Sequence, residues 1–536
     1  MKLGKQSLIF NHQVIAAAVF FITFLLLSGI QAYTQSYDII IENGRIIDGT
    51  GCPWYRADIA VRDGRIAFIG NLKKASAERR IDASGKFVVP GFIDIHTHSD
   101  RSITTEPWGP LAENSVRQGI TTIVAGNCGG SEFPVKEHLA EVQRLRPSIN
   151  YTVLVGHNTI RRLVMGMEDR APAPEELSRM KILVAHGMES GAVGFSTGLY
   201  YTPGFYADTE EIIELAKAAA EYGGIYASHI RDESDYNIGL AAAVKEAVAV
   251  GESAGIPVQI SHIKCLGTPV WKKSDDVLKI IHEARLRGVD VTADQYAYRA
   301  SGTSISGALI PPWAVSGPGT SRENFLETLR DPAGLEKLRK DVASNITRRG
   351  GADTLLLRSS PPDTEFAGMY LNEAAEAMCL NPVEAAIALQ KKGGAGLASF
   401  NMSEYDMEHF MKSPYVMIGS DGGIAEYGRE MPHPRSYGNF PRVLSVFVRD
   451  KGLLTWEEAI KKMTSMPAGR LGLFDRGIIK EGMAADMVVF SPETVEDTAD
   501  FLNPHQYPEG IPYVLVNGKL VVDEAKHTGV RSGRVL

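Results

Sequence analysis

The chain has 536 residues, a hydrophobic fraction of 44%, a charged fraction of 22% and a formal net charge of −8. This length exceeds what a single hydrophobic core usually serves, so it predicts two or three domains of an ordinary globular protein. The mildly acidic balance comes without a basic patch or polybasic tail, which argues against nucleic acid as a partner.

The first 32 residues have the pattern of a secretory signal peptide. Lys2 and Lys5 precede an apolar run at residues 14–30, and the small residue Ala32 follows it. The run is somewhat shorter than the ~20 residues that a membrane-spanning helix needs. Cleavage is therefore the favoured interpretation, and an uncleaved membrane anchor is the alternative. In either case we expect the body of the protein to be exported, either periplasmic or secreted, with no other membrane association.

Short alternating β segments occur near both ends of the chain. Residues 37–90 contain strand-like runs separated by Asn-Gly and Asp-Gly pairs, and residues 476–536 repeat the pattern. Alternation punctuated by such pairs is typical of β-hairpins. We therefore expect one small β-sandwich domain that is built from both termini.

Between these segments, residues 91–475 alternate strand-like and helix-like runs. Helical patterns separate the strands, for example from Asp208 to Gly223 and from Ser274 to Gly288. The eight expected strands lie at residues 92–95, 120–125, 151–155, 192–196, 225–228, 258–261, 289–293 and 415–420. This is the pattern of an α/β fold closed into a (β/α)8 TIM-type barrel, which builds its active site at the carboxyl ends of the strands.

The connection between the seventh and eighth expected strands runs for about 120 residues. Connections of this length are uncommon in compact domains unless they carry structure or function. Residues 308–320 are rich in glycine and proline, and residues 323–346 have a helical pattern. We expect an inserted lid or subdomain near residues 303–365.

Several expected strands end in residues with metal-binding side chains. They are His96, His98, Cys128, His229, His262 and Asp421. His96 and His98 lie one residue apart, and on an extended strand such residues point to the same side. A lone His-x-His pair is a weak signal, because it also fits ordinary core histidines. Imidazole, thiolate and carboxylate are zinc ligands, however, and barrel strand ends converge on one axis, so the whole set predicts a metal centre.

Cys128 and Asp421 have distinct expected roles in that centre. Cys128 lies in GNCGG, where glycines permit unusual backbone geometry, and a metal would hold it as thiolate; a small buried residue is the alternative. Cys52, Cys265 and Cys379 have no paired spacing and are expected to be inert. Asp421 could cap a turn, but at the last strand end it is better interpreted as the general base. A metal would acidify a bound water, and Asp421 would pass its proton to a leaving group.

The order of these motifs resembles the amidohydrolase superfamily, and within it the N-acyl-D-amino-acid deacylase (D-aminoacylase) family. The resemblance covers nearly everything after residue 37 and includes PGFIDIHTHSD, GNCGG, GAVGFSTGLYYTPG, ASHIRDE, QISHIKCLG, DQYAYRA, IGSDGG, HPRSYGNFPR, MTSMPAGRLGL, GMAADMVVF and VLVNG. The cysteine after the second strand is specific, since many relatives bridge their metals with a carboxylated lysine. The family usually has proline where this chain has Ala297, a departure that concerns only the local loop.

The resemblance implies zinc as the cofactor and divides the ligands between two positions. The tight zinc site is implied to comprise Cys128, His229 and His262. A second and weaker position is implied for His96 and His98 with Cys128 bridging. Asp421 is implied to be a further metal ligand as well as the catalytic acid/base.

The resemblance also implies how the substrate is bound and what the reaction is. Lys264, Tyr296 and Arg435 are implied to bind the free carboxylate of the substrate, and the guanidinium fork suits that group best. The implied reaction is zinc-dependent hydrolysis of the amide of small N-acyl-D-amino acids. A D-residue dipeptidase and a cyclic-amide hydrolase are alternatives, of which the cyclic substrate is disfavoured by the carboxylate-binding residues. A non-catalytic scaffold is also disfavoured, because all six positions are present.

Overall fold

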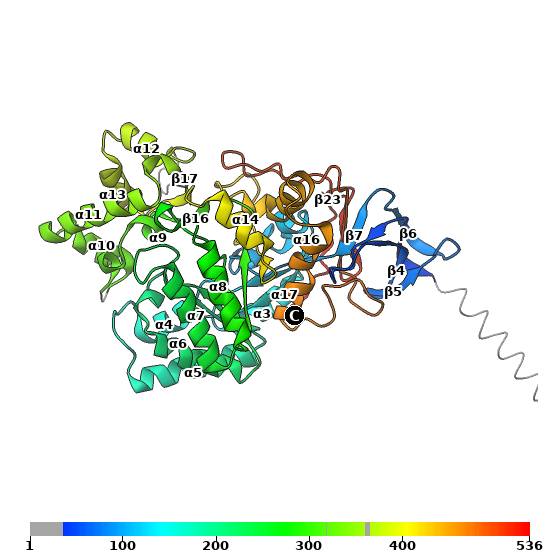
Figure 1. The fold of residues 1–536 in the computed structure, drawn as a ribbon, viewed down its shortest axis with the longest axis horizontal. Coiled ribbons are helices and arrows are strands. Elements are labelled where there is room, and N and C mark those ends of the chain that lie inside the picture. Colours follow the sequence, from blue (N-terminus) through cyan, green and yellow to red (C-terminus); the bar gives the residue numbers. More distant parts are fainter. Residues whose placement is uncertain (1–35, 318, 360–364) are drawn as a thin grey trace, which may run out of the picture.

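A computed structural model describes residues 36–317, 319–359 and 365–536. Along the longest axis of the molecule, a β domain lies at one end, the barrel in the middle and an inserted subdomain at the other end (Figure 1). Within these described ranges, no helix is both long and apolar enough to span a membrane. The segment expected to be a signal peptide lies outside them.

Parallel strands form the barrel in the middle of the described chain. They are β8 (Phe92–Asp94), β9 (Ile120–Ala125), β10 (Asn150–Val153) with β11 (Val155–Gly156), β12 (Gly194–Gly198), β13 (Ile225–His229), β14 (Val258–Ile260), β15 (Val291–Gln295) and β19 (Val416–Ile418). β10 pairs with β9 and β11 with β12, so these two are halves of one strand. The ring closes where Thr97 bridges Gly422 and the Asp421 amide donates to the His96 carbonyl at 2.8 Å. The expected barrel is confirmed.

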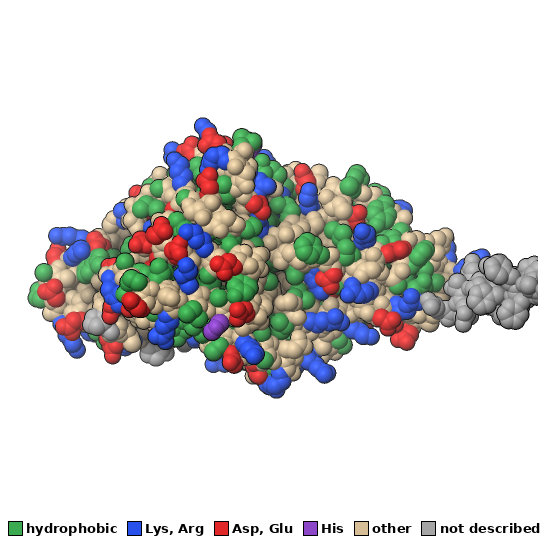
Figure 2. Space-filling model, turned by 90° about the horizontal axis from the view of Figure 1, so that it is seen from below, with side chains coloured by type: hydrophobic (Ala, Val, Ile, Leu, Met, Phe, Trp, Pro, Cys, Tyr) green, Lys and Arg blue, Asp and Glu red, His purple; other side chains and the backbone are tan. Residues whose placement is uncertain are grey.

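Helices cover the outside of the barrel because the connections between parallel strands must cross over. They are α2 (Glu113–Val116), α3 (Val135–Leu145), α4 (His157–Met165), α5 (Pro174–Glu189), α6 (Thr209–Ala220), α7 (Leu240–Ala254), α8 (Ser274–Leu286), α14 (Glu404–Lys412), α15 (Arg435–Arg442), α16 (Trp456–Met463) and α17 (Ser465–Arg470). Asp208 caps α6 by accepting from the Glu211 amide at 2.8 Å. Lys and Arg side chains are interspersed with Asp and Glu on the face that Figure 2 shows.

The β domain is a sandwich of two sheets to which both ends of the chain contribute. One sheet has the order β5 (Arg65–Gly70), β4 (Asp58–Arg62), β1 (Tyr37–Glu42), β6 (Ala77–Asp82). The other has the order β23 (Lys526–His527), β22 (Lys519–Asp523), β21 (Tyr513–Val516), β20 (Met487–Phe490), β7 (Phe87–Pro90), β2 (Arg45–Ile46), β3 (Tyr55–Arg56). Val88 pairs with Val489, so an N-terminal and a C-terminal strand lie side by side over one core with Ile41, Ile59 and Leu515.

The insertion between β15 and β19 is larger than expected. It contains β16 (Ser301–Ser304), α9 (Ile305–Leu309), α10 (Ser321–Thr328), α11 (Pro332–Arg348), β17 (Leu355–Ser359), α12 (Leu371–Ala377), α13 (Pro382–Lys392) and β18 (Gly396–Ser399). It therefore ends at Ser399, not near residue 365. The reason is that β18 returns to pair antiparallel with both β16 and β17 and closes a core that includes α12 and α13. Ser301 and Ser399 are direct register partners.

Candidate metal centre and active site

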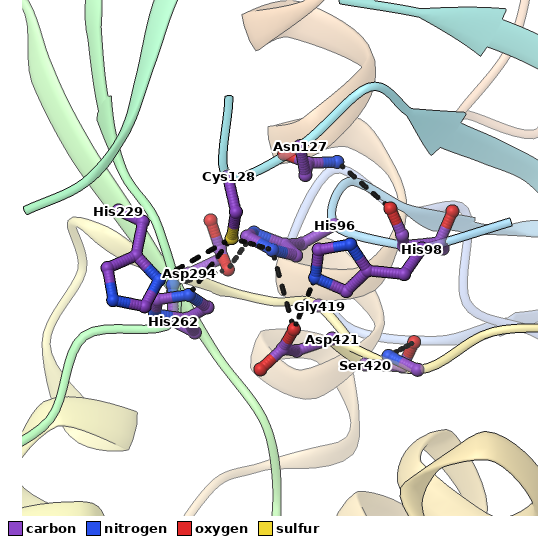
Figure 3. A network of polar contacts seen from close by, with 12 residues as sticks. His96, His98, Asn127, Cys128, His229, His262, Asp294, Gly419, Ser420 and Asp421 are labelled. Carbon is purple, nitrogen blue, oxygen red and sulfur yellow. Dashed lines mark hydrogen bonds and ion pairs between the residues drawn. The ribbon is translucent and has the colours of Figure 1, made fainter. Parts of the chain in front are cut away.

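The carboxyl ends of the barrel strands converge around the sulfur of Cys128 (Figure 3). Cys128 follows β9, and its Sγ lies 3.4 Å from His96 Nε2, 3.4 Å from His262 Nε2 and 3.5 Å from His229 Nδ1. These histidines come from the ends of β8, β14 and β13. Four side chains from four separate strands thus share one small volume, as the strand-end pattern predicted.

Asp421, which follows β19, completes the cluster on the side of the two histidines of β8. Its Oδ1 lies 3.0 Å from His98 Nε2 and 3.5 Å from His96 Nε2. Three overlapping sets of ligand atoms each fall within 4.8 Å of one another: His96–His98–Cys128, Cys128–His229–His262 and His96–His262–Asp421. All six residues expected to bind metal therefore meet at one place.

The spacing of these atoms fits zinc. A tetrahedral zinc ion lies at about 2.3 Å from sulfur and about 2.0 Å from nitrogen, which holds the sulfur and each nitrogen about 3.5 Å apart. The Sγ of Cys128 lies 3.5 Å from His229 Nδ1 and 3.4 Å from His262 Nε2. The donor set of one thiol, several imidazoles and one carboxylate is also that of zinc sites.

Three of these residues adopt left-handed backbone conformations that residues other than glycine rarely use. The φ angles are 52° at Cys128, 36° at His262 and 51° at Asp421. Such a conformation costs roughly 1–2 kcal/mol for each residue. Neighbouring Gly129 has φ 75°, and a Cβ there would lie 2.1 Å from Asn158 Oδ1, so only glycine fits in GNCGG. Backbone strain is thus accepted at three points where the chain turns a side chain toward the metal centre.

Burial and neighbouring charges set the protonation of the site. Burial lowers the pKa of His229 and His262 well below the usual histidine value and raises the pKa of the Cys128 thiol well above its own. Burial raises the pKa of Asp421, but Arg435, whose Nη1 lies 2.8 Å from Asp421 Oδ2, and the surrounding histidines together hold that pKa well below normal. The imidazoles of His229 and His262 are therefore neutral and the Asp421 carboxylate is charged, as cation binding requires.

Glu233 is a residue of the site that the sequence pattern did not assign. Its Oε1 lies 3.1 Å from His262 Nδ1, and its Oε2 lies 3.8 Å from His229 Nε2. These nitrogens are the ones that face away from Cys128. Hydrogen bonding at the far nitrogen fixes the tautomer and orientation of a metal-binding imidazole. Glu233 thus faces both histidines of the implied tight site.

Asp294 has the corresponding position beside His96. It lies at the end of β15, and its Oδ1 is 3.5 Å from His96 Nδ1 and accepts the backbone N–H of His262 at 2.9 Å. Gln259 donates to its other oxygen at 2.7 Å. Asp294 directly follows the strand expected at residues 289–293 and was not among the residues expected in the site. Its place in the structure is that of a carboxylate that orients a ligand histidine.

The three residues expected to bind substrate also come together. Lys264, Tyr296 and Arg435 line a cavity of about 390 Å³ that Cys128, His229 and Asp421 also line. The Arg435 guanidinium lies 4.7 Å from the centre of the Tyr296 ring, and Lys264 Nζ lies 5.8 Å from it. Lys264 Nζ is already engaged, because it pairs with Glu233 and lies 2.8 Å from His262 Nδ1.

Two tyrosines that sequence reasoning left unassigned form another wall of this cavity. Tyr200 and Tyr201 follow β12, and their ring centroids lie 5.6 and 4.8 Å from that of His229. Tyr201 OH lies 3.2 Å from Thr303 Oγ1 of the insertion. Burial raises the pKa of Tyr201 well above its usual value, so its phenol is a neutral group with a proton to donate. The sequence signal that could have identified these two tyrosines is the motif GLYYTPG, which contains both.

A parallel barrel whose strand ends gather a thiol, imidazoles and a carboxylate around a small cavity defines a metal-dependent hydrolase of the barrel class. The chain belongs to the Amidohydrolase family, whose model matches residues 79–299 and 369–522. The interval between these ranges holds β16, β17 and much of the insertion. The family suggested by the motifs is therefore confirmed.

Characterised relatives cover nearly the whole chain. A D-aminoacylase of Alcaligenes xylosoxydans xylosoxydans is 36% identical over 94% of this chain and 99% of its own. An N-acyl-D-glutamate deacylase of the same organism is 37% identical over 94% and 97%. The crystal structure of an N-acyl-D-glutamate deacylase from Bordetella bronchiseptica, complexed with zinc and a phosphonate mimic of the tetrahedral intermediate, has a TM-score of 0.80 and 37% identity, covering 94% of this chain and 100% of that one.

Proposed function

We propose that this protein is a zinc-dependent hydrolase that cleaves the amide bond of N-acyl-D-amino acids, giving a carboxylate and a D-amino acid. The observation that carries the proposal is that one cavity contains both the Cys128 cluster and the Arg435–Asp421 pair, at 2.8 Å. The first suits a metal, and the second suits an amide substrate with a free carboxylate. The D configuration is supported by the relatives, which act on D-amino acid derivatives by name.

The metal would be held mainly by Cys128, His229 and His262, with His96 and His98 forming a second position that shares Cys128. The distances of 3.4–3.5 Å from its sulfur to the nitrogens support both assignments. When bound, zinc supplies a Lewis acid that polarises the acyl carbonyl and makes water nucleophilic at neutral pH.

Asp421 moves the proton in this proposal. Its Oδ1 faces His96 and His98, and its Oδ2 faces Arg435. Because Arg435 and the surrounding histidines together keep the carboxylate ionised, Asp421 can take a proton from the attacking water and give it to the departing nitrogen. A general acid–base of this kind contributes about 10²–10⁴-fold to the rate.

Arg435 and Tyr296 would bind the α-carboxylate of the substrate, with Lys264 beside them. The Nε of Arg435 is buried and has no hydrogen-bond partner among the described residues, although Nη1 pairs with Asp421. A guanidinium presents several donors in one plane, so it can hold Asp421 and still bind a substrate carboxylate. Tyr296 OH lies 3.8 Å from the Met402 sulfur, and the Arg435 guanidinium lies against the same tyrosine.

The test is a screen for release of free amine. Purified protein would be assayed with N-acetyl-D-amino acids, their L isomers, D-dipeptides and cyclic amides, before and after metal removal. We expect turnover of D substrates that disappears with the metal and returns with zinc. Turnover of L isomers or cyclic amides alone would contradict the substrate assignment. A protein that neither binds zinc nor hydrolyses any amide would contradict the reaction itself.

We further propose that the body of the protein is exported. The support is the N-terminal pattern of Lys2 and Lys5 followed by the apolar run at residues 14–30. N-terminal sequencing of the protein recovered from outside the cytoplasm would test this. We expect the mature chain to begin just after Ala32. A chain that still begins at Met1 and remains with the cytoplasm would contradict export.

A further inference from the structure

A second chamber adjoins the catalytic cavity. It has a volume of about 500 Å³, and His98, Gly302, Asp421 and Arg435 line both spaces. Its remaining wall consists of the loop after β19, the segment that leads into α15, Ser102 and Trp108 after β8, and Arg358 from β17 of the insertion. A substrate bound at Asp421 can therefore extend into the second chamber without leaving the active site.

Arg358 differs from the other arginines of this wall in having no hydrogen-bond or ion-pair partner among the described residues. Among the described residues, no hydrogen bond or ion pair holds its guanidinium, and its Nε is buried. The other arginines of the wall are paired: Arg435 with Asp421 at 2.8 Å and Arg429 with Glu426 at 2.9 Å. Burial and the nearby charge of Arg435 lower the pKa of Arg358 to about 10. Arg358 is thus still cationic at neutral pH, and an unpaired cation in such a place is costly unless an anion joins it.

The sheet of the insertion holds this cation at the active site. Two positions in its strands are glycines that border guanidiniums. A Cβ at Gly302 of β16 would lie 3.1 Å from Arg435 Nη2, and a Cβ at Gly396 of β18 would lie 3.7 Å from Arg358 Nη2. The missing side chain at Gly302 leaves room for Arg435, and Gly396 places Arg358 in van der Waals distance of β18. Arg358 also lies between the two ranges that the family model matches.

The α-carboxylate of the substrate does not account for Arg358. That group already has Arg435, Tyr296 and Lys264 in the catalytic cavity, and Arg358 does not line that cavity. Glu430 is a carboxylate in the wall of the second chamber, but no ion pair joins it to Arg358 within the described residues. The chamber therefore presents a free positive charge to whatever extends past Asp421.

We propose that the second chamber binds a second carboxylate of the substrate through Arg358. This inference rests on the proposed function and narrows it to N-acyl-D-amino acids with two carboxylates. The second carboxylate has two possible sources: the side chain of D-glutamate or D-aspartate, or the free end of a dicarboxylic acyl group such as succinyl. Both present the same anion, and paired substrates separate them.

The kinetic test compares each dicarboxylate with a neutral counterpart of the same shape. The pairs are N-acetyl-D-glutamate with N-acetyl-D-glutamine, and N-succinyl-D-leucine with its terminal amide. We expect kcat/KM to favour the dicarboxylate of one pair by about 10- to 100-fold, the usual value of a hydrogen bond to a charged group. Arg358→Gln should bring that ratio close to one, and Arg358→Lys should keep part of it. Arg429→Gln, on the same wall but paired with Glu426, should leave the ratio as it is.

A binding test decides the question independently of turnover. Calorimetric titration of the zinc-loaded protein with D-glutamate and D-glutamine, and with succinate and succinamate, measures the contribution of the second charge directly. The charged member of one pair should bind about tenfold more tightly, and Arg358→Gln should abolish the difference. Equal affinity within both pairs, or a difference that survives in Arg358→Gln, would overturn the proposal. Loss of all D-amide hydrolysis with an intact Arg358-dependent binding difference would refute the proposed function instead.

Discussion

Replacing Glu233 by glutamine should weaken zinc binding although Glu233 is not itself in the set of expected ligands. Its two oxygens lie 3.1 Å from His262 Nδ1 and 3.8 Å from His229 Nε2. Both imidazoles need a hydrogen on that far nitrogen while the other nitrogen binds the metal. Glutamine has one acceptor oxygen and one donor NH2 group. Its oxygen can accept a hydrogen bond from one imidazole, but its NH2 group then faces the N–H of the other imidazole, and two donors repel each other.

The size of this effect follows from the role of such residues in metal sites. Changes in the groups that hydrogen-bond to ligand histidines weaken metal affinity by about 10- to 100-fold, or about 1.4–2.8 kcal/mol. Competition with a chromophoric chelator measures the dissociation constant without any assay of activity. Glu246→Gln is the matched control, because Glu246 is a buried carboxylate that pairs with Arg231 at 2.8 Å and not with the ligand histidines.

The contribution of Lys264 to zinc affinity must be distinguished from the orienting role of Glu233, since the Lys264 ammonium also pairs with Glu233. In Glu233→Gln that cation loses its carboxylate partner and can repel the metal by itself. The double variant Glu233→Gln/Lys264→Met removes this repulsion and isolates the orienting role. Zinc affinity in Glu233→Gln equal to that of the unaltered protein, or full recovery in the double variant, would refute the orienting role of Glu233.

Three further changes test other parts of the site and the fold. Asp421→Asn should keep its fold and lower kcat by about 10²–10⁴-fold, and a full rate in zinc-loaded protein would remove Asp421 from the reaction. Gly302→Ala should lower kcat/KM by about tenfold, because its Cβ would lie 3.1 Å from Arg435 Nη2 and displace it; unchanged kinetics would contradict this. Burial raises the pKa of Asp497 to about 6, so the folded protein retains a proton that the unfolded chain loses above about pH 4. The free energy of unfolding should fall by about 2 kcal/mol from pH 4 to pH 6 in urea titrations, and Asp497→Asn, which can still accept from Tyr298, should lack this decrease.

The sequence was sufficient to place the residues that end strands. Most barrel strands are short, largely apolar and closely followed by a polar residue, so their carboxyl ends can be located within a residue or two. Closure of the barrel then brings His96, Cys128 and Asp421 together whatever the loops do. The same rule selects too many residues, because His157 also ends a strand. In the structure His157 opens α4 and pairs with buried Glu211 at 2.8 Å, where its role is packing.

Residues whose position depends on loop geometry could not be found this way. Glu233 follows His229 by four residues in a loop that no repeat describes, so nothing in the sequence shows that it turns back toward two histidines. The end of the insertion was missed for a similar reason. β18 is a four-residue strand whose partners lie far away in the chain, and its pairing with β16 is visible only in three dimensions.

The pairing of Ser301 with Ser399 means that the insertion leaves and re-enters the barrel at one point. Because its two ends lie together, the insertion acts as a closed loop attached to the barrel. The entropy of closing such a loop depends only weakly on its length, so a change in its length has a small cost. A lineage could lengthen, shorten or rewrite this loop without moving any residue that ends a barrel strand. Yet the loop supplies Arg358 and Thr303 to the walls beside Asp421. The residues proposed for the reaction and the residues proposed to select the substrate thus lie in different segments of the chain, so a change in one segment can leave the other as it is.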